Sequence, residues 1–314
     1  MKQLQDTYFR KDCPFGAFSM TRIFQYIIQK EDSGMTILDF LKKRGFSRHI
    51  LSSMKADKEA ILLNGERGFG RTCLQENDTL RVRLLETESS EKIVPISMEL
   101  HILFEDEDLL VINKGANTPI HPSQGNYENT LANGVAYYYQ SQGETFVYRC
   151  INRLDRDTTG ALILAKNALS AALLSQQMLN RQIKRTYLAL ATGLVPESGT
   201  ISAPIARVDG STIEREVNFE TGEDAVTHFE RLDFKNDFSL IELHLETGRT
   251  HQIRVHMKHI GHPLPGDFLY NPVYDKISRQ ALHSYQIEFT HPITGQPLLF
   301  TAPVPEDFRL AFEK

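Results

Sequence analysis

Residues 152–160 read Asn152-Arg153-Leu154-Asp155-Arg156-Asp157-Thr158-Thr159-Gly160, and the apolar segment Ala161-Leu162-Ile163-Leu164-Ala165 follows directly. An apolar run of this length after a glycine predicts a buried strand. Residues 153–159 thus supply two carboxylates, two guanidiniums and two hydroxyls directly before that strand. A neighbouring Arg keeps an Asp ionised, and hydroxyls can fix its rotamer. The start of this strand is therefore a candidate position for a reactive side chain. The residue types alone also fit an Asx-type turn with surface ion pairs.

Strand-like segments dominate the chain from residue 99 onward. Apolar or alternating runs at 109–113, 185–191, 225–232 and 239–245 are separated by turn residues. Asn167 can cap a helix in which apolar residues recur at helical spacing, and a second helix is predicted at 131–140. Because strands outnumber helices without alternating regularly with them, we expect an α+β fold. Its sheet is expected to be mixed and largely antiparallel, with flanking helices, rather than doubly wound.

Residues 36–85 carry a different charge balance from the rest of the chain. They hold ten Lys or Arg and six Asp or Glu, a net charge of +4, whereas the whole 314-residue chain has a net charge of −5. Such asymmetry indicates a segment that faces nucleic acid, although a solvated basic surface gives the same pattern. The cations that we expect to face RNA are Lys42, Lys43, Arg44, Arg48 and Lys55.

The same segment predicts two short helices and a small sheet. Thr36 and Ser47 can each cap a helix, and Gly45 ends the first. Strands are predicted at 22–28 and 60–64, and at 79–85 apolar residues alternate with Thr and Arg. This arrangement resembles the ribosomal-protein S-four-like RNA-binding module, in which two helices lie against RNA phosphates. We therefore expect a small N-terminal α/β RNA-binding module.

The order of residues from Arg153 to Gly160 matches the signature of the RluA-type pseudouridine synthases, and the chain is identified as resembling that family. Further segments agree in the right order: 185–190 (Arg-Thr-Tyr-Leu-Ala-Leu), 247–256 (Thr-Gly-Arg-Thr-His-Gln-Ile-Arg-Val-His), 261–263, 266–267, 291–292 and 294–295. With the N-terminal module, the resemblance covers roughly residues 22 to 308. It divides the chain into an N-terminal extension (1–20), the S-four-like module (21–88) and a catalytic domain (89–314), with a polar linker at 87–91.

The resemblance implies an enzyme that detaches uracil from its ribose in RNA, rotates the base and rejoins it through carbon five. The product is an isomer, so neither a cofactor nor a metal is expected. Asp155 falls on the family's catalytic aspartate, because a carboxylate can add covalently to the ribose or base, or stabilise positive charge on the sugar. Asp157 is then a turn residue, although the sequence allows the two roles to be exchanged.

Three other residues fall on family positions. Tyr187 matches the active-site tyrosine that stacks on the target base and can remove the proton from carbon five, although a strand tyrosine is also a common core residue. Arg254 matches the arginine that pairs with the catalytic carboxylate, and Arg249 is its near rival. Arg153 matches the residue that fills the gap left by the extruded uridine, and a surface salt bridge is its alternative.

Two features depart from the expected pattern or invite another explanation. Asn152 stands where the family usually has histidine, and Thr159 where it usually has serine; asparagine hydrogen-bonds but cannot be charged. His251, His256 and two further histidines, His259 and His262, suggest a metal site, but their spacing lacks an HExxH pattern. Packing and backbone hydrogen bonds are the expected roles for these histidines.

The cysteines and the hydropathy of the sequence indicate the compartment in which the protein is expected. Cys13, Cys73 and Cys150 are odd in number, far apart and without a CxxC pair, which indicates a reducing cytoplasm rather than a disulfide framework or a zinc ribbon. The sequence shows no targeting segment, and no run reaches the ~18 apolar residues of a membrane helix. We therefore expect no membrane partner and no small-molecule cofactor.

The sequence thus predicts a cytoplasmic, monomeric RNA pseudouridine synthase acting on structured RNA, ribosomal rather than transfer RNA. One alternative is a non-catalytic RNA-binding or ribosome-assembly factor on the same scaffold, supported by Asn152. A carboxylate glycosidase ranks last, because the sequence offers no independent second acid at a defined separation.

Overall fold

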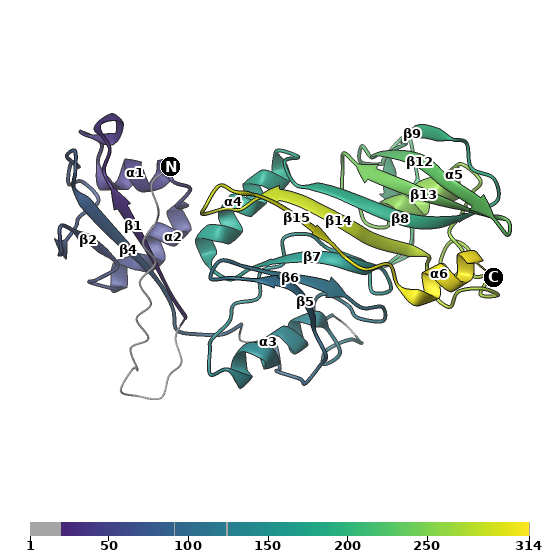
Figure 1. The fold of residues 1–314 in the computed structure, drawn as a ribbon, viewed down its shortest axis with the longest axis horizontal. Coiled ribbons are helices and arrows are strands. Elements are labelled where there is room, and N and C mark those ends of the chain that lie inside the picture. Colours follow the sequence, from purple (N-terminus) through teal and green to yellow (C-terminus); the bar gives the residue numbers. More distant parts are fainter. Residues whose placement is uncertain (1–19, 91, 124, 314) are drawn as a thin grey trace.

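The computed structural model describes residues 20–90, 92–123 and 125–313. The N-terminal extension predicted at 1–20 lies outside the described residues, except for Met20, which begins the first strand. Figure 1 shows a small N-terminal unit at one end of an elongated molecule and a larger sheet that runs through the rest of it.

The N-terminal unit combines a four-stranded sheet with short helices. Its strands, in the order β1-β4-β2-β3, are β1 (Met20–Ile27), β4 (Thr79–Glu86), β2 (Ile61–Leu63) and β3 (Glu66–Arg67). Its helices are α1 (Ile37–Lys43), α2 (Arg48–Ser53) and the 3-10 turns η1 (Lys30–Asp32) and η2 (Met54–Ala56). The two short helices and small sheet expected from the sequence are present.

Local sequence explains where these helices begin and end. The hydroxyl of Thr36 accepts a hydrogen bond from the N–H of Asp39, and the hydroxyl of Ser47 accepts one from the N–H of Ile50, as N-caps do. Gly45 follows α1 with a φ of +93°, a left-handed conformation that favours glycine. In β4, burial alternates as the sequence predicts, so one face of the strand packs on the helices.

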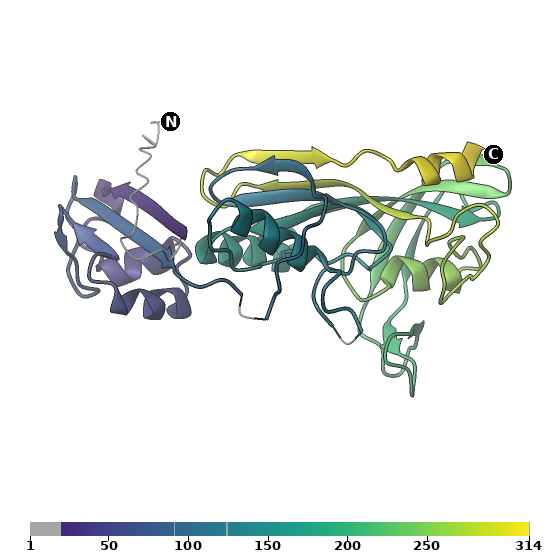
Figure 2. The same ribbon diagram turned by 90° about the horizontal axis from the view of Figure 1, so that it is seen from below.

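The N-terminal unit packs directly on the larger domain. Leu169 and Leu173 of α4 (Ala168–Leu179) join its apolar core, and a Cβ on Gly45 would lie 2.4 Å from a methyl carbon of Leu173. Figures 1 and 2 both show α4 beside the unit. Arg22 forms ion pairs with Glu107 and Asp108 across the same boundary. The linker is also hydrogen-bonded to the larger domain, because the hydroxyls of Ser89 and Ser90 accept hydrogen bonds from the backbone N–H groups of residues 146 and 148.

The larger domain is built on a sheet of nine described strands. Their order is β5-β6-β7-β14-β8-β13-β12-β9, and β15 pairs with β14. Their bounds are β5 (His101–Glu105), β6 (Leu109–Lys114), β7 (Thr159–Ala165), β8 (Lys184–Thr192), β9 (Ser198–Ser202), β12 (Val226–Lys235), β13 (Phe238–Leu245), β14 (Leu282–Thr290) and β15 (Pro297–Thr301). Among these strands only the β7–β14 pair is parallel. The mixed, largely antiparallel α+β fold is confirmed.

Helices cover both faces of this sheet. On one face α3 (Leu131–Ser141) and α5 (Gln252–His259) pack against alternate residues of β6, β7 and β8. On the other face α6 (Glu306–Glu313) packs on Leu188 and Leu190 of β8. Figure 2 shows α6 on the opposite side of the sheet from α3 and α5. A small hairpin of β10 (Ile205–Arg207) and β11 (Arg215–Val217) lies outside the main sheet and contacts the core beside α5. No helix in the described ranges has the length and hydropathy needed to cross a bilayer.

Candidate active site

The segment 149–152 returns along β7 before the loop that carries Asp155. The N–H of Ile151 donates to the carbonyl of Ile163, so this segment extends the ladder on one side of β7. The buried Asn152 side chain continues the pairing: its Oδ1 accepts from the N–H of Ile163 at 2.8 Å and its Nδ2 donates to the carbonyl of Ala161 at 3.4 Å. Asn152 therefore holds the start of the loop and does not face solvent.

Gly160 fixes the other end of the loop. Its φ is +111°, and a Cβ there would lie 2.2 Å from the carbonyl oxygen of Ser284, so only glycine fits. Ser284 pairs with Gly160 on one side and with Tyr187 on the other. Tyr187 is thus two strands from the end of the loop, buried at 4 % exposure on the α5 face of the sheet.

Lys114 and Asp157 clamp the loop to the turn after β6. Lys114 is buried, and its Nζ donates to the carbonyls of Gly115 at 2.7 Å, Thr118 at 3.0 Å and Arg156 at 2.8 Å. Three acceptors require the three hydrogens of the ammonium, whereas burial lowers the pKa of Lys114 to about 7. Asp157 accepts from the guanidinium of Arg156 and from a backbone N–H at residue 117, which is the turn role expected for it.

Asp155 projects from this loop toward α5. Its Oδ2 accepts from Nη1 of Arg254 at 2.8 Å, while Nε and Nη2 of Arg254 donate to the two oxygens of Asp267 at 2.6 and 2.8 Å. The side chains of Arg254 and Asp267 are 1 % and 0 % exposed, and that of Asp155 is 26 % exposed. Burial opposes the charge of Arg254, but the hydrogen bonds that Arg254 donates to Asp267 and the charge of Asp155 together raise its pKa above the usual value.

The rival arginine is directed elsewhere. Arg249 pairs with the carboxylate of Glu223 and donates to the carbonyl of Asp224. Its side chain is 40 % exposed. Of the two candidates, Arg254 is therefore the one that contacts Asp155.

His251 also faces the Asp155 carboxylate. Its Nε2 lies 3.9 Å from Oδ2 of Asp155, and its Nδ1 lies 2.9 Å from the hydroxyl of Tyr270. Burial lowers the pKa of His251, and the charge of Asp155 only partly offsets this. The ring of Tyr270 lies 5.0 Å from the guanidinium carbon of Arg254, within cation–π range.

The expected RNA-facing cations fall into two groups. Arg153, Arg48 and Lys55 are exposed and form no ion pair with the described residues. In contrast, Lys43 and Arg44 both bind the buried carboxylate of Asp32, at 2.6 and 3.1 Å. Lys42 makes only a long, exposed contact with Asp39 at 3.5 Å. Lys43 and Arg44 therefore stabilise the fold of the N-terminal unit and also add to its positive charge.

Three of the four histidines considered for metal binding, His251, His256 and His262, are within hydrogen-bond distance of protein groups, whereas His259 is exposed. His256 bonds to the hydroxyl of Thr227 and the carbonyl of Ala203, and His262 bonds to the carbonyl of Thr192. Within the described ranges the one cluster with metal-ligand geometry is Asp106, Asp108 and His291. Its donors are taken: Asp108 binds the Arg22 guanidinium, and His291 binds Asp106 and accepts two backbone N–H bonds. These residues fit a structural hydrogen-bond network better than a cation.

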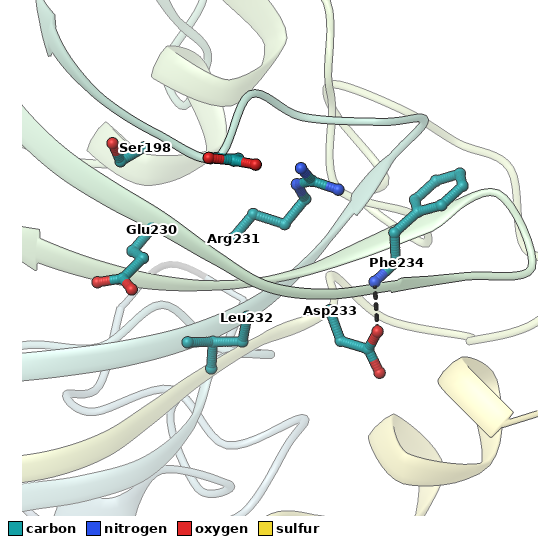
Figure 3. Close-up of a pocket in the computed structure, with 7 residues that line it drawn as sticks. Ser198, Glu230, Arg231, Leu232, Asp233 and Phe234 are labelled. Carbon is teal, nitrogen blue, oxygen red and sulfur yellow. Dashed lines mark hydrogen bonds between the residues drawn. The ribbon is translucent and has the colours of Figure 1, made fainter.

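A separate hollow of about 700 Å³ opens along β9 and β12. Figure 3 shows Glu230, Arg231 and Asp233 among the side chains that line it. Three carboxylates and one guanidinium line this hollow, so its charge does not suit a polyanion. None of the residues around Asp155 contributes to it.

Sequence reasoning missed three parts of the site. Asp267 falls in a segment that matches the family but is not among the predicted site residues, and Gly266 beside it, with a φ of +71°, forms the turn that holds it. His251 was assigned to packing, and its φ of +59° had no signal in the sequence. Lys114 ends strand β6, where a lysine is usually exposed, so nothing in the sequence pattern indicates its burial.

Comparison with known proteins agrees with this geometry. A family model described as RNA pseudouridylate synthase matches residues 108–259, which include Asp155, Tyr187 and Arg254. An uncharacterized RNA pseudouridine synthase of Bacillus subtilis (strain 168), YhcT, is 39% identical over 292 residues, which cover 92% of this chain and 96% of that protein. The chain belongs to the RNA pseudouridylate synthase family. The RluA-type resemblance is confirmed, and this pseudouridine synthase is an isomerase that acts on RNA.

Other relatives of the synthase extend the comparison. The ribosomal large subunit pseudouridine synthase D of Neisseria meningitidis serogroup A is 36% identical over 260 residues, covering 79% of this chain and 70% of that protein. The solved human RNA Pseudouridylate Synthase Domain Containing 1 superposes with a TM-score of 0.55 at 27% identity, covering 65% of this synthase and 83% of that chain. Both comparisons support the same catalytic scaffold.

Proposed function

We propose that this synthase isomerises a specific uridine through Asp155, without a cofactor. The observation that carries the proposal is the 2.8 Å bond between Oδ2 of Asp155 and Nη1 of Arg254, at the mouth of β7. The guanidinium orients the carboxylate and pairs with its negative charge. The other oxygen, Oδ1, accepts no hydrogen bond from the described residues, so it is available to the substrate.

Asp155 supplies the chemistry of bond exchange. A carboxylate can add to the ribose or the base as the glycosidic bond breaks, or stabilise the positive charge that develops on the sugar. Uridine and its product have the same atoms and oxidation state, so the sum of the steps needs no electron donor or acceptor. The hydrogen on carbon five is replaced by the new bond to the ribose, and a hydrogen is returned to nitrogen one.

Tyr187 is proposed to hold the base and to remove the proton from carbon five. It lies two strands from Gly160, the end of the loop that bears Asp155, because Ser284 pairs with both Gly160 and Tyr187. Its aromatic ring offers a stacking surface for uracil, which an extruded nucleotide needs once it leaves its neighbours.

Arg153 is proposed to fill the space that the extruded uridine leaves. Its side chain is exposed, and no carboxylate in the described residues pairs with it. A planar guanidinium can stack on the neighbouring bases and contact phosphates. Extrusion costs a few kcal/mol, and this contact offsets part of that cost.

The N-terminal unit is proposed to be an S-four-like RNA-binding module spanning residues 21–88, ahead of a catalytic domain at 89–314. Arg48 in α2 and Lys55 in η2, both exposed, are its best candidate phosphate contacts. Lys42, Lys43 and Arg44 add positive charge beside them, although the last two are shared with Asp32.

We propose ribosomal RNA as the substrate of a monomeric enzyme in the cytoplasm. Several relatives carry the name ribosomal large subunit pseudouridine synthase D, which supports ribosomal over transfer RNA. The alternative of a non-catalytic factor was supported by Asn152. That residue bonds to β7 and leaves the contact between Asp155 and Arg254 intact, so the alternative loses its support.

The test is to map pseudouridines in total RNA from cells with and without this chain. The expected result is one or a few positions in ribosomal RNA that are modified only when the chain is present. Sites confined to transfer RNA would overturn the choice of substrate. Identical maps, together with no activity of the purified enzyme on unmodified RNA, would overturn the proposed function.

A further inference from the structure

His251 occupies a strained position beside Asp155. It precedes α5 with φ +59° and ψ +17°, a left-handed conformation that is uncommon for residues other than glycine. Strain of this kind at a site indicates that the position of the side chain matters. Its imidazole lies between the hydroxyl of Tyr270 and the carboxylate of Asp155.

Hydrogen bonding fixes which ring nitrogen of His251 carries the hydrogen. The hydroxyl of Tyr270 accepts a bond from the backbone N–H of Arg215 at 2.9 Å. Its own hydrogen therefore needs an acceptor, and within the described residues the Nδ1 of His251, at 2.9 Å, is the one in reach. Nδ1 accepts, so the hydrogen of the neutral ring is on Nε2, which faces Asp155.

The ionisation states agree with this assignment. Burial lowers the pKa of His251, so the ring is neutral at physiological pH. Burial also raises the pKa of Tyr270 to about 12, so its hydroxyl keeps the hydrogen that it donates. These protonation states are consistent with Arg215 donating to Tyr270 and Tyr270 donating to His251.

The space between Nε2 of His251 and Oδ2 of Asp155 fits one oxygen atom. Nε2 of His251 and Oδ2 of Asp155 are 3.9 Å apart, too far for a direct hydrogen bond. An oxygen about 2.9 Å from the nitrogen and about 2.7 Å from the carboxylate closes a triangle over that distance. Such an oxygen must accept from N–H and donate to a carboxylate, which a hydroxyl does and a carbonyl does not.

We propose that His251 and Asp155 together bind the 2′-hydroxyl of the target nucleotide. An internal nucleotide of RNA has its 3′ and 5′ oxygens in phosphodiesters, so the 2′-hydroxyl is its one free ribose hydroxyl. That group is also the one by which a protein distinguishes RNA from DNA. His251 is thus a specificity-determining residue, and the inference rests on the proposed function because Asp155 must face the target nucleotide.

The test uses product RNA, which undergoes no further net reaction. Once mapping has identified the target, a synthetic RNA of that sequence is made with pseudouridine at the position, either with ribose or with 2′-deoxyribose. Wild-type enzyme is expected to bind the ribose form about tenfold more tightly. His251→Gly, which suits the left-handed backbone, is expected to bind both forms with the affinity of wild type for the deoxy form.

Two further variants separate the proposed role from a structural one. Tyr270→Phe keeps the ring against Arg254 but removes the hydroxyl that fixes the tautomer, so it is expected to show a reduced preference for ribose. His259→Ala, at an exposed histidine that ends α5, is the matched control and should keep the full preference. Nitrogen-15 spectra of the RNA-free enzyme should show His251 with its hydrogen on Nε2.

Equal affinity of wild type for the two RNAs, or a tenfold preference retained in His251→Gly, overturns the inference while the mapped modification leaves the proposed function intact. A hydrogen on Nδ1 of His251 also overturns it. If no uridine is modified, the proposed function fails and this inference fails with it.

Discussion

Asp155 and Asp267 share a single guanidinium. Arg254 binds both oxygens of the buried Asp267 and uses its remaining Nη1 to bind Oδ2 of the partly exposed Asp155. Because a guanidinium is planar and rigid, the bidentate contact on one side sets the direction of the third donor on the other. Asp267 thereby positions Asp155 without reaching the substrate side itself.

The first prediction concerns that positioning. Asp267→Asn leaves the buried Arg254 with Asp155 as its one charged partner, so the free energy of unfolding should fall by about 3 kcal/mol. The single-turnover rate should fall on the order of 100-fold while RNA affinity changes little. Urea unfolding and rapid-quench kinetics measure the two effects. The matched control is Asp275→Asn at an exposed acid, and equal behaviour of both variants would refute the positioning role.

A second prediction concerns the ammonium of Lys114. Burial lowers its pKa to about 7, so the third hydrogen, which one of the three carbonyl acceptors needs, is lost as the pH rises above that value. We expect kcat to decline between about pH 7 and pH 9. Lys114→Gln should have a kcat lower by about tenfold and no such decline, because it makes fewer bonds at every pH. A decline that persists in Lys114→Gln would assign it to another group.

The loop and strand at 152–165 could be predicted because the whole pattern is contiguous in sequence. The helix caps Thr36, Ser47 and Asn167 were predicted for the same reason, since each bonds within three residues of itself. Strand β14 was not predicted. It buries His283 and Ser284, whose polar groups bond to Thr159 and Ala161, so its sequence lacks the apolar pattern of a core strand.

The site residues divide in the same way: those in short motifs could be predicted, and contacts between residues distant in sequence could not. Asp155, Tyr187 and Arg254 are predicted from short motifs, and in the structure Arg254 contacts Asp155. The contact of Lys43 and Arg44 with Asp32 was not foreseen. Asp32 is eleven residues from Lys43, and a single acid in a 3-10 turn carries no sign of burial.

A third prediction follows from the buried His283. Its Nδ1 accepts from Thr159 and its Nε2 donates to the carbonyl of Ala302, and burial lowers its pKa from 6.5 to about 4. The folded state therefore binds fewer protons than the unfolded state between those values. Stability is fully present above about pH 6.5 and decreases by about 3 kcal/mol as the pH falls to 4. Urea unfolding from pH 7 to pH 4 should show this loss, and His283→Asn should show a shallower one. Parallel curves would contradict the assignment.

A fourth prediction separates RNA contacts from structural cations in the N-terminal unit. Replacing Arg48 and Lys55 with Gln should weaken RNA binding and reduce the salt dependence of log Kd by about 1 per cation, with no change in thermal stability. Replacing Lys43 and Arg44 should also lower thermal stability, because the buried carboxylate of Asp32 loses both partners. An unchanged salt slope in the first variant would remove Arg48 and Lys55 from the RNA surface.

The central claim is that the Asp155 carboxylate carries out the isomerisation. The most direct measurement maps pseudouridines in cells that lack the chain and are complemented with either wild type or Asp155→Asn. We predict that wild type restores the missing modification and that Asp155→Asn does not, although the purified variant loses no more than about tenfold in affinity for the same RNA. Full restoration by Asp155→Asn would contradict the account.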